Sequence, residues 1–268
     1  NNNDYSAFLL STNNTNFQIT TFLHDTFKDQ IDINFTNKNG NTAFMIAAYN
    51  PNIEIIAFLY EKFKDKVNIN SQNIENYTAF MIAAYNPNVE IITFLYDKFK
   101  NQININFTNK NGNTKFMNAM QKSNVKVITF LYETFKGKIN INIINKNGDT
   151  AFMIAAYNQD VEVITFLYDK FKDQINFALQ NYENNTAFMN AIQRSNVEVI
   201  TFLYGKFKDQ IDINSQNKNG DTAFMKAANA QNVEVIAFLY DKYKDQININ
   251  VQNIENYTAF MIAANNPN

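Results

Sequence analysis

The spacing of apolar residues changes within one short unit of the chain, from helical spacing to alternation. In residues 42–77, an Ala-rich apolar segment at 43–48 predicts a short first helix that stops at a polar Asn-Pro-Asn sequence. Apolar residues then recur at spacings of three and four up to Phe63, which predicts a longer amphipathic second helix with Asn52 as its N-cap. Residues 67–70 alternate apolar and polar side chains before a polar turn. The pattern therefore predicts a helix, a second helix and an extended turn.

This unit is copied along the chain with a period of 36 residues. Thr-Ala-Phe-Met or a close variant opens each copy, and a fixed period of this length is the signature of a solenoid. We therefore expect one all-α repeat solenoid over residues 1–268, with helix-turn-helix units and projecting extended turns or hairpins. The repeats run over 6–41, 42–77, 78–113, 114–149, 150–185, 186–221 and 222–257, with a partial repeat at 258–268. We expect this array to be a piece of a longer one.

The sequence of each unit resembles the ankyrin repeat. The consensus of that family places Asn-Gly-x-Thr before a first helix that ends in Ala-Ala, and a Val-Asn stretch after the second helix. Residues 39–42 and 147–150 match the turn, Ala47 and Ala48 match the helix end, and residues 69–70 match the final stretch. The resemblance covers nearly the whole chain. The main rival, a tetratricopeptide array, has no extended turn and would not need Asn-Gly there.

The chain departs from the ankyrin consensus in ways that bear on packing. Met45 and its equivalents stand where the family has a hydrogen-bonding His, so we expect an apolar stack in place of a polar lattice. Three extra residues extend the second helix through Asp65 and present Phe63 and its equivalents to the neighbouring repeat. We expect the Phe, Met and Leu positions, Phe166 among them, to be buried in every repeat.

Composition excludes several classes of function. The chain has no Cys and one His, His24, so we predict no metal site, no cofactor, no catalytic residues and no enzyme activity. A formal charge of −2 from 23 basic and 25 acidic residues provides no basic stripe for nucleic acid. No apolar stretch approaches 18 residues, which argues against membrane insertion. We expect no small-molecule substrate. The compartment stays open, with the cytoplasm favoured.

The positions at which the copies differ are the candidates for binding. The ankyrin resemblance implies that the turn and the inner helix line a concave surface for protein partners, and Tyr on such a face is a common hot-spot residue. The opposing interpretation is that the large turn residues only pack against the adjacent turn. The candidate partner-binding residues are Tyr49, Ile74, Tyr77, Tyr85, Tyr157, Tyr182, Arg194, Ile254 and Tyr257.

Two functions from different classes remain open at this point. The first is a non-catalytic scaffold that binds a protein or peptide partner through its concave face and projecting turns. The second is a structural role as a spacer, a spring or a filament in which further copies of the chain stack end to end. The closely similar copies fit either role, and an enzymatic domain outside this segment is a third possibility.

Overall fold

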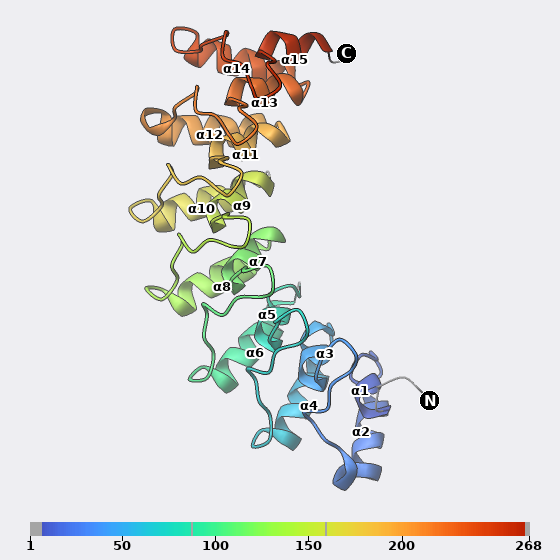
Figure 1. Ribbon diagram of the computed structural model, residues 1–268. Coiled ribbons are helices and arrows are strands. Elements are labelled where there is room, and N and C mark those ends of the chain that lie inside the picture. Colours follow the sequence, from blue (N-terminus) through green and yellow to red (C-terminus); the bar gives the residue numbers. More distant parts are fainter. Residues whose placement is uncertain (1–6, 87, 159, 266–268) are drawn as a thin grey trace. The chain divides into compact units, whose positions relative to one another are not determined.

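The computed structural model describes residues 7–86, 88–158 and 160–265. Throughout these residues the backbone forms pairs of helices joined by turns, and the only β-pairing is an isolated bridge between Thr108 and Thr114. Figure 1 shows successive pairs following one another along the chain. The predicted all-α repeat solenoid is confirmed. The chain divides into unit 1, up to Ile139, and unit 2, from Asn140, and each is described by itself.

Each repeat contains a short first helix and a longer second helix. The first helices are α1 (Ala7–Ser11), α3 (Ala43–Tyr49), α5 (Ala79–Ala83), α7 (Lys115–Gln121), α9 (Ala151–Asn158), α11 (Ala187–Arg194), α13 (Ala223–Asn229) and α15 (Ala259–Asn265). The second helices are α2 (Phe17–Phe27), α4 (Ile53–Phe63), α6 (Val89–Phe99), α8 (Val125–Phe135), α10 (Val161–Phe171), α12 (Val197–Phe207) and α14 (Val233–Tyr243), with 3-10 turns η1 (Lys28–Gln30) and η2 (Lys208–Gln210).

Side-chain caps set where the helices begin. The Asn52 side chain accepts the backbone N–H of Glu54 at 2.9 Å, as the sequence predicts, and the Thr42 hydroxyl accepts that of Met45. The expected continuation of α4 through Asp65 is wrong, because the helix ends at Phe63. The Phe63 carbonyl accepts the N–H groups three and four residues later, which folds the chain into a turn.

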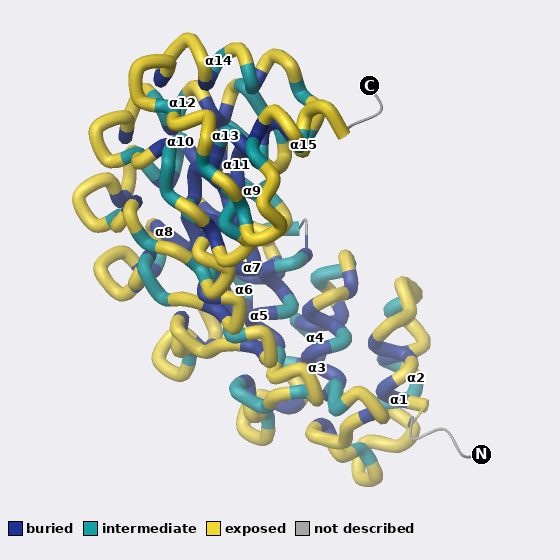
Figure 2. The backbone as a smooth tube through the Cα atoms, turned by 45° about the horizontal axis from the view of Figure 1, so that its top comes forward, coloured by how far each residue is buried: buried dark blue, intermediate teal, exposed yellow. Residues whose placement is uncertain are grey.

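The core runs through the first helices and the inner sides of the second helices (Figure 2). Phe44, Met45 and Leu59 are buried, and so are most of their equivalents. The prediction of burial in every repeat is wrong at two kinds of position. Phe260 is 63% exposed because no second helix follows α15 among the described residues. Phe166 and most of its equivalents are only half-buried, and Phe22 is exposed, because they lie on the outward side of the second helix. The remaining exceptions are Leu23, Phe27, Phe224 and Met261.

Aromatic rings join successive repeats, as predicted for Phe63 and its equivalents, although the second helix ends at that residue. The Phe99 ring meets the Phe44 ring edge-on with centroids 6.1 Å apart, and it also meets Tyr60 at 5.4 Å. In unit 2, Phe207 repeats this arrangement with Phe152 at 5.7 Å and with Tyr168 at 5.6 Å. Edge-to-face pairs of this kind stabilise by about 0.5–1.5 kcal/mol beyond their buried area.

A polar lattice also joins the repeats, contrary to the expectation drawn from the Met residues. Apart from Met261, the Met side chains at the equivalent positions are buried as expected, but an Asn at a fixed place in turns of both units bonds to the preceding repeat. Asn73 accepts the N–H of Tyr77 at 2.8 Å through Oδ1 and donates from Nδ2 to Asn41 Oδ1 at 2.7 Å. In unit 2, Asn181 donates in the same way to Asp149 at 2.8 Å. Asn thus takes over the linking role that His has in the ankyrin consensus.

Candidate functional site

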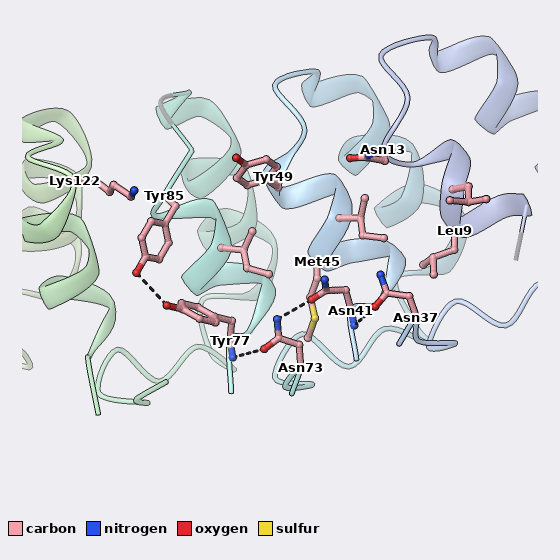
Figure 3. A pocket seen from close by; sticks show the side chains of 13 residues that line it. Leu9, Asn13, Asn37, Asn41, Met45, Tyr49, Asn73, Tyr77, Tyr85 and Lys122 are labelled. Carbon is pink, nitrogen blue, oxygen red and sulfur yellow. Dashed lines mark hydrogen bonds between the residues drawn. The ribbon is translucent and has the colours of Figure 1, made fainter. Parts of the chain in front are cut away.

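A groove of about 670 Å³ runs along the inner face of unit 1, between the first helices and the turns (Figure 3). It extends from Leu9 and Leu10 in α1 to Lys122, which follows α7. Amide side chains of the turn lattice form one wall. Apolar and aromatic side chains of the first helices form the other, among them Ile46, Tyr49, Ile82 and Tyr85. The sequence therefore builds a groove by placing unlike side chains at equivalent positions of successive repeats.

Tyr77 and Tyr85 form a hydrogen-bonded pair at one end of this groove. Their hydroxyl oxygens lie 3.2 Å apart and point toward each other in Figure 3, and their rings meet edge-on at 5.7 Å. Asn109 Nδ2 donates to the Tyr77 hydroxyl at 2.7 Å, which leaves the Tyr77 proton for Tyr85. Burial, and then the hydrogen bond with Tyr77, raise the pKa of the Tyr85 phenol. The Tyr85 phenol therefore stays neutral, and the hydrogen bond fixes the two rings in place before any partner arrives.

The rest of the groove offers an apolar surface with one cation. The Tyr49 side chain is 66% exposed, and Ile46 and Ile82 are half-buried. Lys122 Nζ lies 5.5 Å from the centroid of the Tyr85 ring, a cation–π contact at the end of the groove. Among the described residues that line the groove, Lys122 is the charged one. This arrangement can bury an apolar side chain and hold an anionic group beside Lys122.

The large residues of the turns lie differently from the residues of the groove. The side chains of Ile74, Tyr182 and Ile254 are all more than half exposed, and Tyr257 is also exposed. The backbones of Ile74, Tyr182 and Ile254 pack on a preceding Gly turn, and a Cβ on Gly148 would come within 2.6 Å of the Tyr182 nitrogen. The close approach explains why Gly turns precede these bulky turns. The Tyr182 ring also lies against Gly148, with Cδ1 2.9 Å from the same Cβ position, so the turns pack through backbone and ring while much of each large side chain stays exposed.

Unit 2 brings together two further candidates, Tyr157 and Arg194. The Arg194 guanidinium carbon lies 3.9 Å from the centroid of the Tyr157 ring, so the two groups stack. Asp149 lies nearby in the turn lattice. Burial raises the pKa of its carboxyl, while hydrogen bonds from Asn181, Asn147 and Asn190 oppose that shift. The inner face of unit 2 is therefore more polar than that of unit 1.

Several residues of the unit 1 groove were not among the candidates from sequence. Leu9, Leu10, Met45 and Lys122 line the groove but occupy positions that read as core or as helix ends. The signal that could have found the amide wall was the Asn at one fixed place in each turn, at Asn37, Asn73, Asn109, Asn145, Asn181, Asn217 and Asn253.

The described residues contain no group of three or more His, Cys, Asp or Glu side chains placed to hold a metal ion. Within the same residues, every helix is too short or too polar to cross a lipid bilayer.

Comparison with known protein families agrees with this architecture. A model of three consecutive ankyrin repeats matches residues 63–143, 135–217 and 206–268, and a single ankyrin repeat model matches residues 39–74. A search of curated proteins gave no match. The matched ranges together cover most of the sequence. The chain therefore belongs to the ankyrin repeat family.

Proposed function

We propose that the protein is a non-catalytic scaffold that binds a protein or peptide segment in the groove of unit 1. Ankyrin repeats generally mediate protein–protein interaction, and proteins built from them are typically scaffolds without catalytic activity. The observation that carries the proposal is the preformed groove, in which a fixed tyrosine pair and the exposed Tyr49 face open space. Tyr side chains held in place lose little conformational entropy on binding, which favours them as anchors.

The chemistry of the groove favours a particular kind of segment. An apolar side chain of the partner would lie between Ile46, Ile82 and Tyr49, where it removes apolar surface from water. A carboxylate or another anionic group would lie beside Lys122. The asparagine wall offers amide groups for the backbone of an extended segment.

Selection from a random peptide library displayed on phage tests this proposal. Peptides that bind the wild-type chain should be enriched in apolar residues followed or preceded by an acidic residue. Ile82→Asn should weaken their binding by about tenfold or more, because roughly 1.4 kcal/mol of lost burial corresponds to that factor. The helix pair should tolerate the substitution, since Ile82 is only half-buried and Asn190 occupies the equivalent position in another repeat.

A matched control comes from the outer side of the array. Lys62→Ala removes an exposed charge on α4, outside the groove, and should leave binding of the selected peptides unchanged. Peptides that bind Ile82→Asn as tightly as the wild type would contradict the proposal. Loss of binding in Lys62→Ala alone would place the binding surface on the outer helices instead.

End-to-end stacking is a second candidate function, supported by apolar side chains at both ends of the described residues. Phe22 in α2 is 66% exposed, and Phe260 and Met261 in α15 are exposed as well. Contact between such faces is head-to-tail and need not close, so it would give open filaments. Light scattering over a range of protein concentration tests it. Growth of the scattering mass with concentration supports stacking, and a constant monomer mass contradicts it.

A further inference from the structure

One repeat carries a buried lysine where each of the others has alanine. Lys115 opens α7 at the position of Ala43, Ala79 and their equivalents, and it is 1% exposed. Its Nζ donates to the main-chain oxygen of Asn104 and lies over the rings of Phe107, at 5.3 Å, and Phe80, at 5.9 Å. The side chain of Lys115 thus fills a space between two successive repeats with an alkyl chain that ends in an amine.

The equivalent space in unit 2 is open. Three repeats further along the chain, Ala223 stands in the position of Lys115 and lines a cavity of about 140 Å³. The cavity is also lined by Phe188, Asp212 and Ser215, which correspond to Phe80, Asn104 and Phe107 around the Lys115 amine. A single water needs roughly 10–15 Å³ of such space, so the cavity has room for several heavy atoms.

The open cavity is richer in hydrogen-bond acceptors than the space that Lys115 fills. Asp212 contributes a carboxylate where the other repeat has Asn104, and Ser215 contributes a hydroxyl that donates to Asp212 Oδ2 at 2.9 Å. The Asp212 main-chain oxygen accepts the N–H of Ser215, as the Asn104 oxygen accepts that of Phe107. The Asn104 oxygen accepts the lysine amine in addition, which shows that this turn carbonyl has a second lone pair facing the cavity.

One carbonyl at this cavity lacks the side-chain amide donor that its equivalents have. In five loops an Asn donates its Nδ2 to the carbonyl of the next repeat, as Asn70 does to the Gln102 oxygen at 2.9 Å. The others are Asn34, Asn106, Asn142 and Asn214. Ala178 replaces this Asn beside the cavity and cannot supply a donor to the Gln210 carbonyl. The walls are largely apolar and include the rings of Phe177 and Phe188. Asp212 and the turn carbonyls supply acceptors beside the amide and hydroxyl side chains of Gln180, Gln210 and Thr186.

We propose that the cavity beside Ala223 is a binding site for a primary alkylammonium group. An ammonium has three donors and no acceptor, which complements the carboxylate and carbonyl oxygens at this cavity. Its alkyl stem would lie against Phe188 and Phe177, as the Lys115 stem lies in the equivalent space. The group could come from a free amine or from a lysine side chain of a partner, because both present the same chemistry.

A titration with n-butylammonium chloride tests the proposal. Binding is measured by isothermal titration calorimetry and by the NMR shift of the Ala223 methyl resonance. Binding should shift this resonance, and n-butanol, which has the same alkyl chain and no charge, should bind at least tenfold more weakly. Asp212→Asn should weaken binding of the butylammonium ion by about tenfold or more. That variant should fold normally, because Asn occupies this position in most other repeats and caps the same turn, as Asn68 does.

Two further variants give matched controls. Asp160→Asn removes a carboxylate from the N-cap of α10, outside the cavity, and should leave binding unchanged. Ala223→Lys copies the arrangement of Lys115 into unit 2 and should abolish binding by filling the cavity, while retention of the circular dichroism spectrum shows that the protein has folded. Equal binding of butanol, or undiminished binding in Asp212→Asn or Ala223→Lys, would overturn the proposal, as would the absence of any shift in the wild type.

The two sources of the ammonium group are distinguished with a lysine probe. Nα-acetyl-lysine methylamide presents the side chain as a partner protein would, with the backbone attached. Displacement of butylammonium by this probe, but not by its Nε-acetylated form, indicates a lysine of a partner. Binding of butylammonium without such displacement indicates a free amine.

Discussion

The inner faces of unit 1 and unit 2 are built on the same scaffold and differ in chemistry. In unit 1, Ile46 and Ile82 follow the first-helix Met, and a tyrosine pair closes an apolar groove. In unit 2, Asn190 and Lys226 occupy two of the equivalent positions. Asn190 bonds to Asp149, and burial lowers the pKa of Lys226, against the opposing effect of Asp221.

The difference shows that each repeat separates its stabilising positions from its variable ones. Phe, Met and Leu fill the core in both units, and Asn links the turns in both. The positions that face the groove vary without changing the helix pair. A solenoid of this kind can therefore present two unlike surfaces along one chain.

The largest expected effect tests whether the scaffold is the same in both units. Phe80→Ala and Phe152→Ala each remove a ring that is at most 3% exposed, so each should lower the free energy of unfolding by about 3–5 kcal/mol. The midpoint of urea unfolding measures this. Phe166→Ala is the control, because its half-buried ring should cost less than half as much. A much smaller loss in only one unit would show that the two cores differ.

Lys115 should make the stability of the chain depend on pH. Burial lowers the pKa of Lys115 from 10.5 to about 7, so between these values the unfolded chain binds more protons than the folded one. Stability should therefore rise with pH above 7. The gain is about 1.4 kcal/mol for each pH unit, or roughly 2–3 kcal/mol between pH 7 and pH 9.

The variant Lys115→Ala isolates this effect. Alanine is the residue found at this position in the other repeats, and it should remove the pH-dependent gain between pH 7 and pH 9 and stabilise the chain at pH 7. Unfolding in urea at the two pH values measures both outcomes. An unchanged pH dependence in Lys115→Ala would show that the amine is hydrated in the folded chain. Unit 2 has Ala223 at the equivalent position, so this position of unit 2 should add nothing to the pH dependence of stability.

Asn118 and Asn190 sharpen the comparison between the units, because they occupy the same position of the repeat. Asn118 is fully buried, and neither its Nδ2 nor its Oδ1 has a hydrogen-bond partner among the described residues. Asn118→Ile should therefore raise the free energy of unfolding by about 1–3 kcal/mol, since an unsatisfied buried amide is removed. Asn190→Ile should lower it, because Asp149 loses a hydrogen bond. Thermal unfolding of the two variants measures these changes. Equal changes of the same sign would contradict the conclusion that Asn190 is hydrogen-bonded and Asn118 is not.

The fold could be predicted from the sequence because it rests on repeated local signals. The Thr and Asn caps and the regular spacing of Phe63 and its equivalents each occur several times, so one ambiguous copy is corrected by the others. Positions such as Tyr77 and Tyr85 were recognisable as variable. Their hydrogen-bonded pairing was not, because it depends on how the turn of one repeat lies against the helix of the next.

The cavity beside Ala223 was harder still to foresee. Its existence depends on the combined absence of an amide at Ala178 and of a long side chain at Ala223, in residues far apart in sequence. Alanine at either position reads as ordinary helix or loop composition. A cavity is a property of packing between repeats, and periodicity within one repeat carries no information about it.

The smallest expected effect concerns the tyrosine pair. It tests whether the hydrogen bond between the two hydroxyls, and not only the contact of the rings, holds the groove in shape. Tyr85→Phe removes one hydroxyl from a half-buried pair, and the Tyr77 hydroxyl keeps its bond from Asn109. The free energy of unfolding should fall by about 0.5–1.5 kcal/mol, the usual net contribution of one hydrogen bond. Tyr157→Phe in unit 2 is the control, because Arg194 stacks on the ring and the stack does not use the hydroxyl. If Tyr157→Phe lowered stability as much as Tyr85→Phe, the hydroxyl pair would not be what fixes the unit 1 groove. A loss of stability in Tyr85→Phe alone, together with weaker peptide binding by that variant, would show that the hydroxyl pair both fixes the groove and supports peptide binding.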